Sequence, residues 1–237
     1  MSSLDDLDRL LKRKRALDVR EAERPELAAR LRELRGWQAG RLARTYEDLG
    51  NEPRYRAGLD FFLTDLYGPQ DFAWRDRNID RAWDRLKRTL PRALLSVLGE
   101  VVELESLTAQ LDHAMVAELA PGTVTAASYA AAYRAVGQPA ARKRQIELII
   151  GIGARLDQAV AHPLIGLALR AARIPAYATG FGVLQSFLER GYTALRDMKG
   201  AASLFELIRV RETRLMEALF QGDPDPFGAG ARHSVYG

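Results

Sequence analysis

Two carboxylates on one long apolar helix are the residues best placed to do chemistry. Glu105 and Asp112 lie two helical turns apart in the segment 91–119, which carries Leu, Val or Met at most positions of one face. A helical projection at about 100° per residue places both carboxylates near the middle of that face. Buried carboxylates need partners, because an unpaired charge in the interior costs several kcal/mol. The pattern is compatible with acid–base catalysis and with a structural ion-pair cluster.

Four further helical segments bring one polar side chain each towards such a cluster. A guanidinium of the last helix and an amide of the segment 140–161 project inward, an arginine ends a short apolar helix, and a tyrosine lies on one side of an Ala-rich helix. Because helical bundles often retain such clusters to fix helix register, we favour a structural role over catalysis. The predicted cluster consists of Glu105, Asp112 and Arg211, with Gln145, Arg173 or Tyr129 as further members.

Composition and motifs argue against several classes of site. The chain has no cysteine, so disulfides, thiolate catalysis and cysteine-bound metals are excluded. None of its three histidines, His113, His162 and His233, belongs to a Glu-x-x-His motif, and we predict no metal and no cofactor. There is no Gly-x-Ser-x-Gly elbow and no phosphate-binding loop. A net charge of +4 over 237 residues is weak support for nucleic acid as a partner.

The periodicity of apolar residues predicts an all-α fold. About nine helices in a single-domain bundle surround the long central helix 91–119, and no segment shows the period-two alternation of a strand. We expect one helical domain over 1–221, with a peripheral helix at 3–20, and a flexible Gly/Pro-rich tail over 222–237. Further predicted helices include 54–67, 72–90, 164–173, 176–198 and 201–221.

Three runs of residues resemble a known family. They are FFLTDLYG at 61–68, ELESLTAQLD at 103–112 and LQSFLERG at 184–191. Together they resemble an uncharacterised bacterial family of all-helical proteins with an FFLxDLYG signature, over roughly 54–220. The resemblance implies the helical fold and no particular mechanism.

The signature also implies that Asp65, Tyr67 and Gly68 belong together. From the residues alone, they form the end of a helix followed by a turn glycine that tolerates left-handed geometry. A loop that contacts a ligand or partner is the alternative interpretation.

The function expected from these features is binding. The amino-terminal segment lacks a signal-peptide hydrophobic region and no apolar run reaches about 18 residues, so we expect a cytoplasmic protein without a membrane span. We expect a non-catalytic helical protein that binds a protein partner or a small apolar or acidic ligand, with a homodimer as one such assembly. The alternatives are an enzyme that uses Glu105 and Asp112 on a small molecule, and a nucleic-acid accessory protein that uses its Arg-rich first helices.

Overall fold

The structure, a computed structural model, describes residues 4–62, 64, 92–178, 180 and 182–228. These residues form ten helices and no strand, which confirms the predicted all-α fold. The predicted helix 72–90 lies outside the described residues. In chain order the helices are α1 (Leu4–Glu23), α2 (Pro25–Thr45), α3 (Glu47–Gly50), α4 (Pro53–Phe61), α6 (Arg92–Glu118), α7 (Ala126–Val136), α8 (Pro139–Ala161), α9 (Pro163–Ala178), α10 (Gly182–Asp197) and α11 (Ala202–Gln221).

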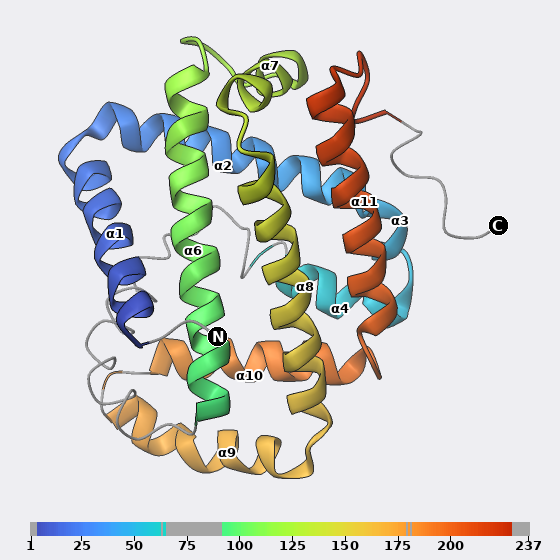
Figure 1. Cartoon of the computed structure of the whole chain (residues 1–237). Coiled ribbons are helices and arrows are strands. Elements are labelled where there is room, and N and C mark those ends of the chain that lie inside the picture. The colour runs from blue at the N-terminus through green and yellow to red at the C-terminus, as the bar shows by residue number, and fades with distance from the viewer. Residues whose placement is uncertain (1–3, 63, 65–91, 179, 181, 229–237) are drawn as a thin grey trace.

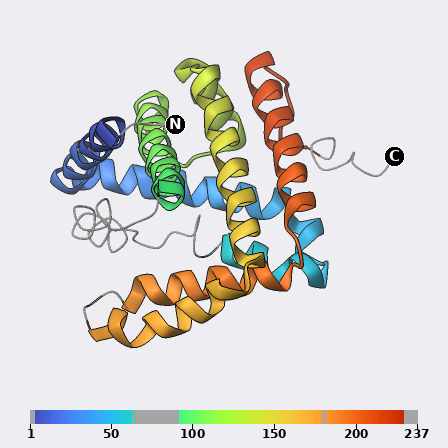
Figure 2. The ribbon, with the colours of Figure 1, turned by 60° about the horizontal axis from the view of Figure 1, so that its bottom comes forward.

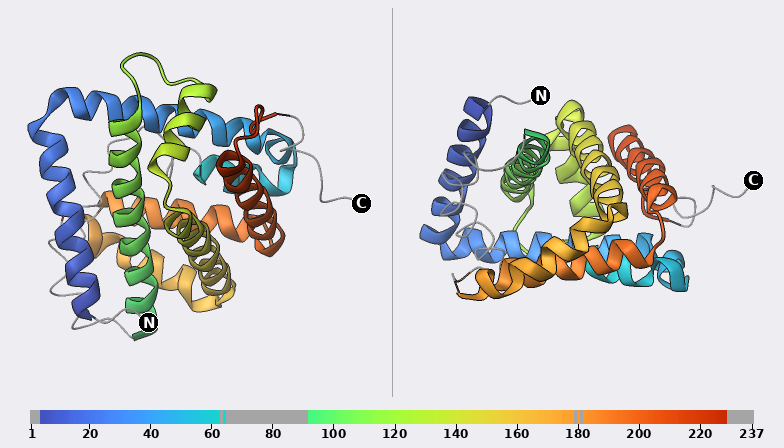
Figure 3. Two further views of the ribbon diagram at one scale, coloured as in Figure 1. Left: turned by 45° about the horizontal axis from the view of Figure 1, so that its top comes forward. Right: turned by 90° about the horizontal axis from the view of Figure 1, so that it is seen from below.

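The helices form two crossing layers. Figure 1 shows α1, α6, α8 and α11 side by side in one layer, with α8 antiparallel to both of its neighbours α6 and α11. Helices α2 and α10 run across this layer, near its two ends (Figure 3). Helix α9 packs along α10, and this pair forms one end of the molecule (Figure 2). Side chains at different positions along α2 can therefore contact different helices of the layer formed by α1, α6, α8 and α11, which we call the upright layer.

The central helix forms where the apolar pattern predicts it. The prediction covers 91–119, and α6 spans Arg92–Glu118. Val102, Leu111 and Met115 of α6 are buried, and Leu119 follows the helix end into the core. The inner face of α6 therefore follows the sequence pattern, and this face positions Asp112.

Two apolar clusters hold the layers together. One joins α2, α6, α7 and α11, and the other joins α3, α4, α10 and α11. The first includes Leu31, Leu34, Met115, Tyr129, Tyr133, Leu215 and Leu219, and the second includes Tyr55, Leu59, Leu195, Met198, Leu204 and Phe205. The polar residues described below lie at the edge of the first cluster.

Two glycines within helices allow close contacts between helices. A Cβ atom at Gly153 of α8 would overlap the ring of Phe205 on α11, and one at Gly191 of α10 would lie 2.8 Å from Phe61. For Gly191 this is the close helix packing expected from its place in an apolar arc. Gly180, expected in the same helix, instead lies between α9 and α10 with φ +82°. Its left-handed backbone is one that glycine adopts without strain.

Helix boundaries around Pro175 differ from the prediction. We expected a helix over 164–173 stopped by Ile174–Pro175, but α9 continues through Pro175 to Ala178. Proline fixes φ near −65°, which a helix accepts, and its cost is one lost hydrogen bond and a clash with the preceding turn. Pro175 therefore removes only the one hydrogen bond that its nitrogen would donate to the carbonyl four residues earlier, and α9 continues for three more residues. As a consequence α10 begins at Gly182 rather than near 176.

Part of the predicted tail packs against the helices. Pro226 is buried, and the ring of Phe227 lies 5.4 Å from Trp37 in an edge-to-face contact. Phe227 also contacts Tyr129, with ring centroids 6.1 Å apart. The packed part of the chain therefore extends beyond Gln221 to Gly228, and residues 229–237 lie outside the described residues.

Candidate functional site

A row of polar side chains on α2 reaches into the interior. Arg35, Gln38 and Arg41 follow one another at a spacing of three residues, so they lie along one side of the helix. Asp112 of α6 is 3% exposed and accepts hydrogen bonds from Nε of Arg35 (3.3 Å) and Nε2 of Gln38 (3.2 Å). Both carboxylate oxygens of Asp112 are therefore bonded to α2.

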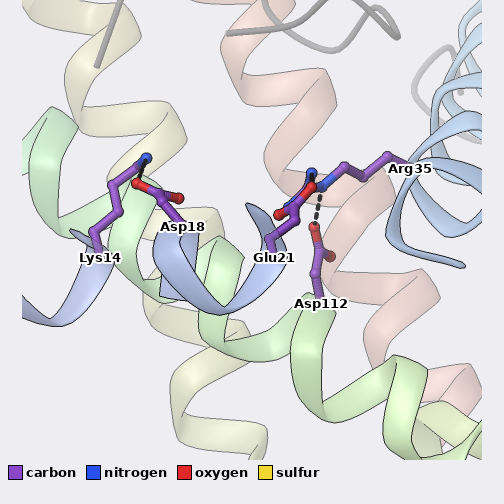
Figure 4. A network of polar contacts seen from close by, with 5 residues as sticks. All are labelled: Lys14, Asp18, Glu21, Arg35 and Asp112. Atoms are coloured by element: carbon purple, nitrogen blue, oxygen red, sulfur yellow. Dashed lines mark hydrogen bonds and ion pairs between the residues drawn. The ribbon is translucent and has the colours of Figure 1, made fainter. Parts of the chain in front are cut away.

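Arg35 connects three helices. Its two Nη atoms donate to the carboxylate of Glu21 on α1 at 3.0 and 3.2 Å, while its Nε donates to Asp112. Figure 4 shows Arg35 reaching from α2 between Glu21 and Asp112, with the separate pair Lys14–Asp18 further along α1. One guanidinium thus fixes α1 and α6 relative to α2.

The row continues to α11 through Arg41. Its Nη1 lies 2.6 Å from Oε1 of Glu212, and the same oxygen accepts a hydrogen bond from the Tyr46 hydroxyl at 2.9 Å. The side chains of Arg41 and Glu212 are 13% and 14% exposed. We call Arg35, Gln38, Arg41, Asp112 and Glu212 the α2 polar cluster.

Aromatic rings of α7 cover this cluster. Tyr129 stacks on Trp37 of α2 with ring centroids 4.2 Å apart, and Tyr133 lies 6.0 Å from Tyr129. The guanidinium of Arg142, in the first turn of α8, lies 4.3 Å from the centre of the Tyr133 ring. Charged groups of α2, α6, α8 and α11 therefore meet below α7.

Burial and pairing act in opposite directions on the charges. Burial raises the pKa of Asp112 above its ordinary value, although Arg35 and Gln38 favour the ionised form. Burial disfavours the charged form of Arg41, yet Glu212 keeps the pKa of Arg41 above its ordinary value. Burial also raises the pKa of Tyr129, so its hydroxyl stays protonated at neutral pH.

The structure does not bring all residues of the predicted cluster together. Asp112 and Tyr129 are both buried at the α2 polar cluster, close enough for the Asp112 charge to raise the pKa of the Tyr129 hydroxyl, beside the larger effect of burial. Glu105 is half-buried on α6, and Gln145 of α8 donates to Thr108 of α6 at 2.8 Å. The remaining residues named for the cluster or the signature are Arg211, Arg173, Asp65, Tyr67 and Gly68.

Two arginines have different partners from those predicted. Arg211 is buried but binds the carboxylate of Asp48 and the carbonyl of Thr45, because α8 lies between its helix α11 and α6, which carries Asp112. Arg173 is 59% exposed and pairs with Glu189 of α10 at the surface. The expected placement of Arg173 in a buried cluster is therefore wrong. Asp65, Tyr67 and Gly68 lie outside the described residues.

The α2 residues were missed although the sequence carries a signal for them. Leu27, Leu31 and Leu34 form an apolar stripe, and Gln38 occupies the next position at that spacing. A polar residue in the place of an apolar one on an inner face indicates a buried polar group that needs a partner. That signal identifies Gln38, and Arg35 and Arg41 follow as its neighbours one turn away.

A second candidate surface lies on α9. Its outer side carries large apolar residues that are strongly exposed: Leu164 is 60%, Leu167 58% and Ile174 81% exposed. Helical spacing places small exposed residues between them, and the exposed Arg170 borders this side next to Leu167 and Ile174. We call the residues Leu164, Leu167, Ala168, Ala171, Ile174, Pro175 and Ala178 the α9 face.

A shallow hollow borders one end of the α9 face. It has a volume of about 640 Å³ and is lined by residues of α9 and α10. An ion pair between Arg173 and Glu189 forms its polar side, while Ile174, Tyr177 and Ala178 form its apolar side. The hollow is therefore suited to an apolar side chain with polar groups at its edge.

Two features that would indicate other classes of site are absent from the described part of the chain. It holds no group of three or more His, Asp or Glu side chains that could bind a metal ion. None of its helices alone is both long and apolar enough to cross a membrane, and α8 with α9 pass this test only as a pair that is bent by 88°.

Fold and cluster together define an all-helical protein with a partly buried ion-pair network along a crossing helix. The chain belongs to the family described as Domain of unknown function (DUF8198), whose model matches residues 18–226. This match agrees with the predicted membership in an uncharacterised family. No curated protein and no solved structure matches the chain.

Proposed function

We propose that the protein is a non-catalytic helical binding protein that associates with a second copy of itself through the α9 face. The observation that carries this proposal is the exposure of Leu164, Leu167 and Ile174 along one side of α9. Large apolar side chains that gather on one exposed side of a helix are suited to contact with another protein surface, because covering them removes apolar area from water. The hydrogen bonding of Asp112 supports the non-catalytic part, because each of its two oxygens accepts a hydrogen bond from α2.

The α9 face is complementary to itself in an antiparallel pair. If a two-fold axis passes near Ala171, each large residue of one copy faces a small or cyclic residue of the other. Leu164 then lies opposite Ala178, Leu167 opposite Pro175 and Ala168 opposite Ile174. The position opposite Leu164 adjoins the 640 Å³ hollow, which can receive that leucine.

The size of the α9 face predicts a weak dimer. A helix of 16 residues is about 24 Å long and 10 Å wide, so its outer side covers on the order of 240 Å² in projection. Stable interfaces bury about 800 Å² on each partner. We therefore expect a dimer that forms at high protein concentration and dissociates on dilution.

Sedimentation velocity across a wide range of protein concentrations tests the association. Ile174→Glu places a charge in the centre of the pair and should weaken the dimer by about tenfold or more, which corresponds to at least 1.4 kcal/mol. Val19→Glu is the matched control, because Val19 is 53% exposed on α1, away from the α9 face. A wild-type protein that stays monomeric throughout would contradict the proposal. If that monomer instead co-floats with anionic vesicles, the α9 face is a membrane-binding surface.

A cysteine crosslink tests the register of the pair. The chain has no cysteine, so Ala171→Cys introduces a single thiol at the proposed two-fold axis. Mild oxidation should give a covalent dimer of this variant, because a disulfide needs Cα atoms within about 7 Å. Ala117→Cys, which is exposed on α6, is the control and should stay monomeric. If both variants crosslink equally, the contact is non-specific and the register is refuted.

A further inference from the structure

Arg142 is a buried cation with unmet hydrogen-bond donors. It is 5% exposed, and its Nε and Nη2 atoms have no hydrogen-bond partner among the described residues. Arginine remains charged in proteins, so it cannot relieve this cost by losing a proton. A buried charge is costly unless hydrogen bonds and an opposite charge compensate it. The Nε–Nη2 edge of Arg142 is therefore suited to an acceptor from outside the described residues.

The first turn of α8 is electropositive around Arg142, and the Asp112 carboxylate of α6 is an opposite charge near enough for the Arg142 charge to lower the pKa of Asp112. Arg142 lies in this first turn, where the helix dipole is positive and where no acidic residue is present. Lys143 and Arg144 follow it directly. The face of the Tyr133 ring, 4.3 Å away, offers a cation–π contact but cannot accept hydrogen bonds along the edge of the guanidinium plane.

The acids of the α2 polar cluster are already engaged. Asp112 accepts hydrogen bonds from Arg35 and Gln38, and Glu212 accepts them from Arg41 and Tyr46. Arg41 has a buried Nε that also lacks a partner among the described residues. Two cations below α7 therefore carry unmet donors, while the acids of the cluster hold other partners.

The free edge of Arg142 is the one that binds carboxylates elsewhere in this molecule. Arg144 holds Glu103 through Nε and Nη2 at 2.7 and 2.9 Å, and Arg173 holds Glu189 through the same two atoms at 2.9 and 2.6 Å. These two donors are parallel and match the two oxygens of a carboxylate or a phosphate. The unmet donors of Arg142 thus have the geometry of an oxyanion site.

We propose that Arg142 binds a small oxyanion, a carboxylate or phosphate group, through its Nε–Nη2 edge, with the Nε of Arg41 as a second donor in the same interior. This site is independent of the α9 face. The competing possibility is that ordered water alone satisfies these donors, as it does for many buried polar groups.

Thermal unfolding in inorganic phosphate and in acetate, at constant ionic strength with chloride as the reference, tests the site. Binding to the folded state raises the Tm as the anion concentration passes its Kd. Arg142→Met removes the charge and the donors and should abolish the rise. Lys143→Met is the matched control, because it removes one exposed charge at the neighbouring position and should keep the rise.

Arg142→Lys keeps the proposal testable if Arg142→Met does not fold. Lysine preserves the charge but has no two-donor edge, so the anion affinity should fall by about tenfold, the loss of one charged hydrogen bond. A wild-type Tm that is the same in chloride, phosphate and acetate would overturn the proposal in favour of water. A rise that persists in either Arg142 variant, at wild-type strength, would place the site elsewhere and also overturn it. A rise in only one of the two anions supports the site and identifies its ligand class.

Discussion

Charged side chains lie inside the molecule along α2, whereas apolar side chains lie outside it along α9. Helix α2 crosses the upright layer, so Arg35 and Arg41 reach acids on α1, α6 and α11. Helix α9 packs on α10 and the end of α8, and its outer side contacts neither. The two helices differ in how many other helices they cross. Helix α2 crosses several helices, whose acids pair with its arginines, whereas α9 lies at one end of the molecule and one of its sides has no neighbouring helix in the described part of the chain.

The two regions also differ in what they contribute. Buried ion pairs add little net stability, but losing one partner leaves an uncompensated charge. The α2 polar cluster therefore makes other arrangements of the helices costly and so favours a single register. The α9 face exposes apolar surface to water, which is unfavourable for the isolated chain. This surface contributes favourable free energy only when a partner covers it.

Among the charged residues of α2, Arg41 should have the largest effect on the stability of the folded state when it is removed. Arg41→Met leaves the buried Glu212 with only the Tyr46 hydroxyl among the partners described above, and should lower the free energy of unfolding by about 3 kcal/mol. Urea unfolding followed by circular dichroism measures this change. Arg209→Met removes the exposed partner of Glu206 on α11 and should leave the unfolding midpoint unchanged. Equal unfolding midpoints for both variants would show that the Arg41–Glu212 pair stabilises the fold no more than the exposed Arg209–Glu206 pair does.

Removing Arg35 should cost less, because its side chain is 37% exposed. Arg35→Met should lower the free energy of unfolding by about 1–2 kcal/mol, between the values for buried and exposed pairs. In a background of Asp112→Asn the same substitution should cost less, since the buried charge is already gone. Additive effects in this double-mutant cycle would mean that the Arg35–Asp112 contact is not energetically coupled.

The sequence predicts the central helix and the burial of Asp112, but not the partners of Asp112. The apolar periodicity of this segment predicts both the extent of α6 and which of its residues point inward, Asp112 included. Partners depend on how helices cross, and this is decided by packing between distant segments. The predicted pair of Asp112 with Arg211 fails for that reason, because α8 lies between their helices. Among the residues of the α2 polar cluster that lie on α2, only Gln38 could have been predicted from the sequence, because it continues the apolar stripe of Leu27, Leu31 and Leu34.

The outer side of α9 could not be predicted for a different reason. The helix is apolar around most of its circumference, and the pattern of such a helix does not say which side another element covers. The same limit applies to Arg173, whose place at the end of an apolar helix indicated burial although it pairs with Glu189 at the surface. Only the packing of α9 on α10 separates the covered side from the exposed one.

Acid should act on two neighbouring residues of α6 in opposite directions. Burial lowers the pKa of His113 below 6.5, so its contribution to stability is complete above pH 6.5 and is lost as the pH falls through the folded-state pKa. Burial raises the pKa of Asp112, so its contribution is complete below about pH 3.8 and is lost as the pH rises through its folded-state pKa. His113→Gln should therefore flatten the loss of stability as the pH falls below 6.5, and Asp112→Asn should remove the gain in stability as the pH falls through the folded-state pKa of Asp112. Urea titrations at several pH values measure both slopes, and unchanged slopes would refute the assignment.

The smallest effect on stability is expected on the α9 face. Ile174→Ser replaces a side chain that is 81% exposed, so the free energy of unfolding of the monomer should change by no more than about 0.5 kcal/mol. Leu34→Ser, at a position with no exposed surface on α2, is the contrast and should cost about 3 kcal/mol or more, because it leaves a cavity and buries a hydroxyl. The measurement is urea unfolding at low protein concentration, where the proposed dimer is dissociated. A loss for Ile174→Ser comparable with that for Leu34→Ser would mean that the monomer itself covers Ile174. The apolar surface would then belong to the core, and the contrast between α2 and α9 would disappear.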